Sequence, residues 1–543
     1  MKRNLIILVV LLGMLVLSGC TTGPVQEPEI LPEESEDSVT QIELGPNEFM
    51  LASLPDLEPF TPYTEISDRF YEEYTDHLIP RKDYGRLYPF AGKVRTDSNR
   101  YTVDVRYGLC DAEGRVVVDP VYSYWNIFEV GEQKIIALYR QTEEIIESAV
   151  GEQPVTLLSL AASDGSWVTE EREAYVVGQD EQAIVIASVQ HYLLNEETGE
   201  AISDETQTVY IYDLQGVLQR TVENVTPMGY NQGTLAVFTE QGGQVQDLEG
   251  KVILSGLYAP RPFYGEYAPV GIGQQEYVLM DRQGNYDPEH VYSYLYFDSA
   301  AEMYQFDTLD NMHGYVDLSG NVIVRTQGSI YMCEDEYTGH TILEEKNYET
   351  STYAVTDLDT GASMTRVISD GTMNYLGNGW VQCTFRVDGN EGQEYLELYH
   401  LEEDMPQEAV YSIEGGGYCD LLEKNLLVIS GIAQPIAEDA GVSIEYAPQS
   451  STLLFDLQNG TEWARISGSV NWVVPGLGIM IQPPNDWLSS NLYGADGQRL
   501  LEGRYYSVQE AGDGYWAVAG TRYAGLVDKQ GQWVIRYCIN TTD

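Results

Sequence analysis

Basic residues are scarce in this sequence. The 543 residues include 29 Lys and Arg against 85 Asp and Glu, so the formal net charge is -56 at pH 7. Nucleic-acid binding relies on clustered Lys and Arg that neutralise phosphates, so this balance argues against a nucleic-acid partner. It also disfavours adhesion to anionic polymers or acidic lipid surfaces, while calcium or a basic partner stays open.

Cysteine and histidine are equally sparse, with six of each. No CxxC pair and no HExxH spacing occurs, so neither a zinc site nor a disulfide framework is indicated. A nucleophile elbow, a P-loop and a complete GxGxxG are also missing. The sequence therefore predicts a protein that is not an enzyme and that needs no metal or cofactor.

Long apolar runs are limited to one, at the N-terminus. Lys2 and Arg3 precede the apolar stretch Leu5 to Leu17, which is short for a membrane span and typical of a signal peptide. Leu17-Ser18-Gly19-Cys20 follows and resembles a bacterial lipobox. We expect residues 1–19 to be a lipoprotein signal peptide and Cys20 to be the lipidated residue. An ordinary secretory signal with an incidental Cys20 is the alternative.

Two further segments precede the folded part of the chain. Residues 20–47 combine prolines with many carboxylates and few apolar residues, which predicts an extended acidic tether. Residues 48–84 contain an apolar stripe with a four-residue spacing, which predicts a short amphipathic helix ending at Pro80. The stripe consists of Ile66, Phe70, Tyr74 and Leu78.

The rest of the chain repeats one short pattern: apolar residues, Asp, two spacers, Gly, then apolar residues again. The clearest copies are Tyr107 to Val118 and Tyr523 to Ile535. Asp and Gly at these positions suit a type I turn, since Asp caps the turn amides and Gly accepts a positive φ. Flanking β-branched and aromatic residues make each copy a β-hairpin. The Asp residues are best explained as turn residues; other copies are Asp213–Gly216, Asp247–Gly250, Asp281–Gly284 and Asp317–Gly320.

Looser versions of the same hairpin fill the intervals between the clear copies. One hairpin without the Gly is expected from Tyr395 to Ser412, turning near residues 402–404. The spacing between turns is roughly 30 to 50 residues, as in propeller blades and similar arrays. The looser turns are Asp164–Gly165, Asp357–Gly361, Asp456–Gly460 and Asp496–Gly497.

These strings resemble WG repeats, which consist of an aromatic residue, Gly, an apolar pair, Asp, two spacers, Gly and an apolar run. The resemblance covers roughly residues 85 to 540, although Tyr107, Tyr315 and Tyr523 replace the Trp that gives the repeat its name. Such repeats are common in bacterial envelope proteins. The resemblance implies a β-rich array of mostly unassigned activity, and it carries no active-site residues.

We therefore predict an all-β fold for residues 85–543, a β-propeller of about seven or eight blades, because closure removes exposed sheet edges. An open solenoid of hairpins is the second choice. If the array closes, its first and last repeats meet, and Cys110 could approach Cys538 closely enough for a disulfide.

Aromatic residues are abundant, with 41 Tyr and 8 Trp, and most of them suit strand packing. Loop aromatics that could instead contact a ligand are Tyr418, Trp487 and Tyr292 to Tyr296. We expect a lipid-anchored envelope protein, facing away from the cytoplasm, that binds protein or glycan without catalysis. A secreted carbohydrate hydrolase and an envelope assembly or sensing factor are the alternatives.

Overall fold

The protein is described by a computed structural model that is all-β. No helix occurs among the described residues, and so none there has the length and apolar character of a membrane span. The predicted signal peptide, the tether, Cys20 and the expected helix around Ile66–Leu78 lie outside the described residues. Those residues are 48–50, 84–97, 102–131, 133–148, 151–191, 193–194, 201–202, 206–386, 394–401, 408–414, 418–433, 450–482, 489–501, 503–521 and 523–538.

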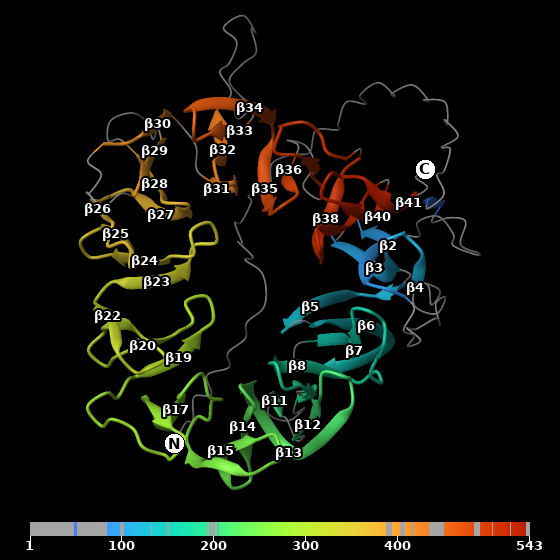
Figure 1. Cartoon of the computed structure of the whole chain (residues 1–543), viewed down its shortest axis with the longest axis vertical. Helices are drawn as coiled ribbons and strands as arrows, with labels where there is room; N and C mark the ends of the chain where they lie inside the picture. Colours follow the sequence, from blue (N-terminus) through green and yellow to red (C-terminus); the bar gives the residue numbers. More distant parts are fainter. Residues whose placement is uncertain are drawn as a thin grey trace, which may run out of the picture. The chain divides into compact units, whose positions relative to one another are not determined.

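Within the unit Gly45–Asp543, antiparallel strand meanders follow one another in chain order, and we call each of them a blade (Figure 1). The first four blades contain β2 (Leu87–Asp97), β3 (Thr102–Asp111) and β4 (Val116–Tyr122); β5 (Tyr124–Val130), β6 (Gln133–Ser148) and β7 (Gly151–Ala162); β8 (Ala174–Gln179), β9 (Ile184–Ser188), β12 (Gln207–Tyr212) and the first part of β13 (Leu218–Asn231); and the rest of β13 with β14 (Thr234–Thr239), β15 (Gly242–Asp247) and β16 (Val252–Leu257). The small ribbon of β10 (Leu193–Leu194) and β11 (Ala201–Ile202) pairs separately.

The next three blades are formed by β17 (Tyr267–Gly273) and β18 (Glu276–Asp281); β19 (Tyr294–Asp298), β20 (Met303–Asp307), β21 (His313–Val316) and β22 (Val322–Thr326); and β23 (Ser329–Glu334), β24 (Thr341–Asn347), β25 (Thr352–Asp357) and β26 (Ser363–Val367). The last four are β27 (Gly371–Gly377), β28 (Trp380–Arg386), β29 (Glu394–His400) and β30 (Tyr411–Glu414); β31 (Tyr418–Glu423), β32 (Leu426–Ala433), β33 (Ser450–Asp456) and β34 (Thr461–Ser467); β35 (Ser469–Val474), β36 (Gly478–Gln482) and β37 (Asn491–Tyr493); and β38 (Tyr505–Gly512), β39 (Tyr515–Gly520), β40 (Tyr523–Asp528) and β41 (Trp533–Cys538).

The blades are joined through apolar residues on both sheet faces. Runs of consecutive buried residues, such as Ile184–Ala187 in β9 and Ala524–Val527 in β40, show that a neighbouring sheet covers each face. In the part of the chain that the structure describes, ten hydrophobic clusters lie between neighbouring sheets, for example the one that joins Val355 of β25 to Val381 of β28. Each blade is therefore held by its predecessor and its successor.

The blades form a closed circuit, because the first blade packs against the last. Phe90 of β2 stacks on Tyr537 of β41 with ring centroids 5.6 Å apart, and both belong to one cluster that also contains Leu109 and Leu526. This closure confirms the predicted propeller and excludes the open solenoid. The last sheet also contains a short strand, β1 (Glu48–Met50), which pairs in parallel with β41 at the edge of the sheet.

The blade number differs from the expectation. Among the described residues, eleven blades remain when the β10–β11 ribbon is set aside and the seven-stranded sheet is divided at β13. Each of them contains one of the turns or hairpins located in the sequence, so the estimate of seven or eight was lower than the number of these turns. The blade of β35 to β37, for instance, turns at Asp496–Gly497, where the two residues are adjacent.

The Asp–Gly turns themselves are confirmed. In the last blade, Asp528 Oδ1 accepts the amides of Gln530 (2.9 Å) and Gln532 (2.8 Å), and the Gly531 amide donates to the Asp528 carbonyl (2.9 Å). The glycines have a positive φ, as the type I turn with a following left-handed residue requires. The same pattern recurs at Asp111, Asp213, Asp247, Asp281 and Asp317.

The looser predictions also match the structure. Gly361 and Gly460 each donate a backbone hydrogen bond to the Asp four residues earlier, and Gly165 has a φ of 70°. β29 pairs with β30 with Glu397 opposite Ser412, which confirms the hairpin predicted without a Gly. Its turn residues 402–404 lie outside the described part of the chain.

Cys110 is a free, fully buried thiol, and burial raises its pKa above the ordinary range. The conditional disulfide with Cys538 is therefore not formed, although the two repeats that would carry it do meet. Cys110 instead packs in the closing cluster as a small apolar side chain.

The turn glycines serve the packing between blades as well as the turn. A Cβ added to Gly216 (φ 73°) would lie 2.4 Å from the Trp167 ring of the preceding blade. A Cβ added to Gly284 (φ 83°) would meet nothing closer than 3.9 Å. The two positions thus share the backbone constraint and differ in the space available.

We expect Gly284→Ala to lower the free energy of unfolding by about 1 kcal/mol, through the left-handed backbone alone. Gly216→Ala should cost clearly more, about 2–3 kcal/mol, because Trp167 must also move. Urea denaturation followed by tryptophan fluorescence measures both. Equal losses in the two variants would show that the contact with Trp167 does not constrain Gly216.

Candidate functional site

The candidate site is a cavity of about 400 Å³ between β5 and β6 on one side and β38 on the other. Its lining side chains come from blades that are separated in the circuit by the blade of β2 to β4, which contributes no residue to the lining. That intervening blade has three strands among the described residues, whereas the last blade has four plus β1. The lining residues are Trp125, Asn126, Ile127, Glu129, Lys134, Gln509, Glu510 and Gly512.

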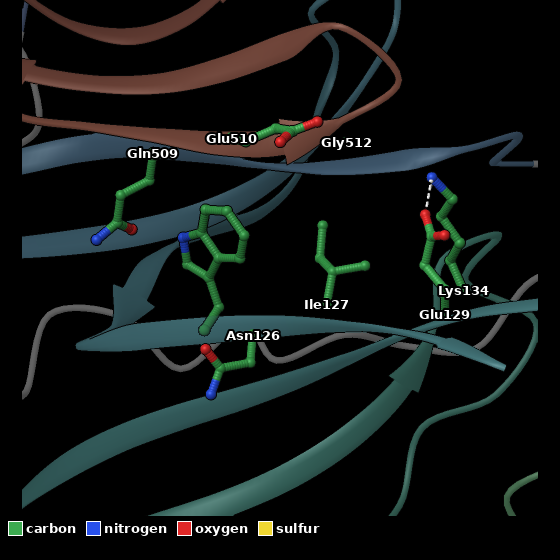
Figure 2. A pocket seen from close by; sticks show the side chains of 8 residues that line it. Asn126, Ile127, Glu129, Lys134, Gln509, Glu510 and Gly512 are labelled. Atoms are coloured by element: carbon green, nitrogen blue, oxygen red, sulfur yellow. Dashed lines mark ion pairs between the residues drawn. The ribbon is translucent and has the colours of Figure 1, made fainter. Parts of the chain in front are cut away.

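Strand register decides which side chains reach this cavity. Trp125 of β5 is 8% exposed, whereas Asn126 and Glu129 are exposed. Asn126 and Glu129 are three residues apart, so their side chains lie on opposite faces of the strand. Gln509 and Glu510 are exposed on β38, between the buried Val508 and the turn to β39. In Figure 2, Gln509 and Ile127 extend from opposite strands into the same space.

One end of the cavity is fixed by ion pairs. Lys134 Nζ lies 2.6 Å from Glu129 Oε1 and 3.3 Å from Asp513 Oδ1, and Figure 2 marks the first of these pairs. The hydrogen bond that Lys134 donates to Glu129 is the main cause that raises the pKa of Lys134. Lys134 is thus a cation held between two carboxylates.

Asp513 connects three blades beside the cavity. It accepts a hydrogen bond from Tyr88 Oη (3.1 Å) and forms an ion pair with Arg86, in addition to Lys134. Burial and then the Asp513 carboxylate raise the pKa of Tyr88 to about 12. The site therefore rests on a rigid junction of β2, β6 and the β38–β39 turn.

One of the residues that line the cavity, Trp125, has an unsatisfied donor. Trp125 Nε1 is buried and has no hydrogen-bond partner, and its ring packs edge-on against Tyr107 at 6.3 Å. Leaving a buried donor unpaired costs about 1–3 kcal/mol. Trp516 has the same unpaired Nε1, but it does not line this cavity. The combination of the free donor and the cavity is what singles out Trp125.

A second cavity, of about 310 Å³, lies in the blade of β17 and β18. Tyr292, one of the aromatic residues predicted from the sequence to contact a ligand, lines it and is 5% exposed. Tyr294 is 40% exposed and packs on Tyr277 and Tyr296, outside that lining. Trp487 and the side chain of Tyr418 lie outside the described residues.

The histidines stay apart, as their scattered spacing indicates. His290, His313 and His340 each pair with one aspartate, and Asp357 raises the pKa of His340. Within the described ranges, no group of three or more His, Cys, Asp or Glu is placed to hold a metal ion.

Sequence reasoning missed the first cavity entirely. Trp125 follows one of the clearest repeat copies, Tyr107 to Val118, and nothing in the sequence there distinguishes it from a core aromatic. Gln509 lies more than 380 positions later, and the two residues meet only because the circuit closes.

Comparison with known proteins finds only weak similarity to solved structures. No protein-family model matches this chain, and no curated protein matches it by sequence. Similar solved structures include a eukaryotic initiation factor (9% identity, covering 70% of this chain and 96% of that one, TM-score 0.33), BamB from Moraxella catarrhalis (12%, 58% and 96%, 0.23) and the Dos1 propeller (9%, 75% and 92%, 0.28). Similarity at this level transfers neither function nor residues.

Glu344 on β24 is a carboxyl group in an unusual environment, away from both cavities. It lies opposite Tyr331 of β23 in the sheet, and burial raises its pKa to about 7, partly offset by a hydrogen bond from the Tyr375 amide. Burial is the main cause that raises the pKa of Cys333 to about 11, and the charge of Glu344 adds to this effect.

The raised pKa of Glu344 predicts a pH-dependent loss of stability. Because the folded pKa of about 7 exceeds the ordinary 4.5, the folded state holds the proton more tightly. The contribution of Glu344 to the free energy of unfolding is fully present below pH 4.5 and is lost as the pH rises through 7. Glu344→Gln should therefore be more stable than wild type above pH 7, by on the order of 2–3 kcal/mol, and equal to it at pH 4.5.

Urea denaturation at pH 4.5, 6 and 8 measures this difference. Glu349→Gln is the control, because Glu349 is exposed in the turn between β24 and β25. If the free energies of unfolding of Glu344→Gln and wild type differ by the same amount at all three pH values, the raised pKa of Glu344 is contradicted.

Proposed function

We propose that this protein is a non-catalytic glycan-binding module held on the outer side of a cell membrane by a lipid on Cys20. The observation that supports the binding role is the buried, unpaired indole N–H of Trp125, a residue that lines an open cavity. A ligand with an acceptor oxygen would satisfy this donor.

The other polar groups of the cavity suit a polyhydroxyl ligand. The amide of Gln509 offers donors and an acceptor, and Glu510 offers acceptors alone. Sugar hydroxyls are both donors and acceptors, so they can pair with both groups. Ile127 supplies an apolar wall for the C–H face of a sugar ring. The volume of about 400 Å³ falls in the usual range of ligand pockets.

The location outside the cytoplasm is supported by the sequence. The positive residues, the apolar stretch and the tetrad ending in Cys20 occur in the order of a lipoprotein signal, and the resemblance to WG repeats agrees with an envelope protein. An acidic tether after Cys20 would hold the propeller away from the bilayer.

A carbohydrate hydrolase is the second candidate, because two carboxylates, Glu129 and Glu510, line the same cavity. A glycosidase needs a carboxylic acid that keeps its proton near neutral pH. Glu129 is instead paired with Lys134, and Glu344, whose pKa is raised, lies elsewhere. Binding without hydrolysis therefore fits the geometry better.

We expect the full-length protein to bind envelope polysaccharides on a glycan array without cleaving them. Trp125→Phe should weaken the binding of a retained glycan about 5- to 10-fold in calorimetry, since one hydrogen bond contributes about 1 kcal/mol. Trp516→Phe is the matched control, because it removes an equally buried and unpaired indole N–H outside the cavity and should leave affinity unchanged.

Three results would each count against the proposal. The array could retain no glycan, both tryptophan variants could lose affinity equally, or the sugar could be cleaved in a reaction that Glu510→Gln abolishes. The last result would favour the hydrolase. A protein captured with no glycan retained would favour the assembly or sensing role.

The anchoring makes a separate prediction. Cys20→Ala should abolish incorporation of an alkyne-tagged fatty acid and move the protein from the membrane fraction to the soluble one. Cys333→Ser, which changes a free thiol of the folded part, should still be labelled. Fatty-acid labelling that persists in Cys20→Ala would remove the lipoprotein assignment and leave glycan binding untouched.

A further inference from the structure

The blade of β17 and β18 departs from the repeat. The other blades that have a clear Asp–Gly turn continue directly into a strand after it, as β22 follows the Asp317–Gly320 turn. Here residues 285–291 form a loop, and the chain returns at Tyr292, which bridges to Tyr277. A single bridge between Tyr277 and Tyr292 is found where those blades have a strand, and residues of the loop line the cavity of about 310 Å³.

Three tyrosines form the aromatic part of this cavity. Tyr292 is 5% exposed and packs on Phe306 with ring centroids 4.6 Å apart. Tyr267 lies close to the Gly320 turn of the next blade, where an added Cβ would be 3.7 Å from its ring. Tyr286, on the loop, is 41% exposed and forms the rim. Two walls are thus fixed by packing, and the third is accessible.

The charged lining is acidic. Asp281 and Asp287 line the cavity, and no Lys or Arg does. The hydrogen bond from Asn285 is the main cause that lowers the pKa of Asp281. His290 Nδ1 lies 3.0 Å from Asp287 Oδ2, and it is the one basic side chain in the lining.

The nearby arginines are engaged elsewhere. Arg282 stacks over the Phe263 ring at 4.3 Å, and Arg325 lies 3.5 Å from Asp310. Arg325 is near enough to oppose the effect of burial on the pKa of Tyr292, but it does not line the cavity. The cavity therefore has aromatic walls, two carboxylates and no Lys or Arg in its lining.

We propose that the Tyr267–Tyr286–Tyr292 cavity binds an organic ammonium group. Tyrosine faces attract cations through the ring quadrupole, and aromatic pockets of this kind recognise quaternary ammonium ligands. The two carboxylates add attraction, and the net charge of -56 draws cations toward the surface. This site is independent of the glycan cavity, since the two share no residue.

Calorimetry on the full-length protein tests the proposal with small probes. Choline and N-acetyl-lysine methylamide distinguish a quaternary from a primary ammonium source. 3,3-Dimethylbutanol, the uncharged isostere of choline, measures the apolar part alone. We expect at least one ammonium probe to bind and the isostere to bind at least 10-fold more weakly.

Two substitutions of Tyr286 separate the ring from its hydroxyl. Tyr286→Ala should weaken ammonium binding about 5- to 10-fold, whereas Tyr286→Phe should keep it within about 2-fold, since a cation contacts the ring face. Tyr258→Ala is the control, because Tyr258 is 54% exposed and lies outside the cavity. Tyr286 is on the surface, so these variants should fold.

The proposal is overturned if neither ammonium probe binds at about 10 mM, or if the isostere binds as well as choline. It is equally overturned if Tyr286→Phe loses as much affinity as Tyr286→Ala, which would indicate a hydrogen bond to a neutral ligand. None of these results bears on the Trp125 variants, so the two proposals succeed or fail separately.

Discussion

The fold depends on the contact between its first and last blades. Every blade has apolar residues on both faces, so an open array would expose two large apolar surfaces, one at each end. The stacking of Phe90 on Tyr537 buries both at once, and Asp513 adds charged contacts to Arg86 and Lys134 at the rim of the same junction. Because exposed ion pairs contribute little and apolar burial contributes more, the cluster supplies the stability, while Asp513 fixes the register of the junction.

The same packing explains which parts of the fold were predictable from the sequence. A turn that needs a capping Asp and a Gly with a positive φ has a recognisable pattern of neighbouring residues, so these hairpins could be located one by one in the sequence. At Gly216 the glycine of this pattern is also required by the contact between blades, since Trp167 leaves no room for a Cβ. The hairpin of β29 and β30 lacks the Gly and was recognised from its strand pattern alone. Every blade among the described residues thus contains a turn or hairpin located in the sequence, although the estimated blade number was lower than the number of these turns.

The cavities were predictable only in part, for a physical reason. A turn depends on four neighbouring residues, but the first cavity joins Trp125 to Gln509 and exists only after the circuit has closed. Strand alternation would have indicated that Gln509 points away from the core, without indicating what it faces. Tyr292 was selected from the sequence as a loop aromatic and does line a cavity, yet its ring is buried against Phe306. Tyr286, which forms the exposed wall, carries no distinguishing signal in the sequence.

Both cavities lie where the repeat is incomplete. The first is bordered by a blade with three strands among the described residues, and the second occupies a blade with two. In a complete blade, the side chains of the strands pack against the neighbouring sheets, and this packing limits which residues can stand there. Where a strand is missing, the neighbouring side chains have no partner within the fold, and the position becomes free to take polar or aromatic groups suited to a ligand. Trp125 Nε1 and the Tyr286 ring are examples of such groups, so an irregular blade is where binding can evolve without loss of the closed circuit.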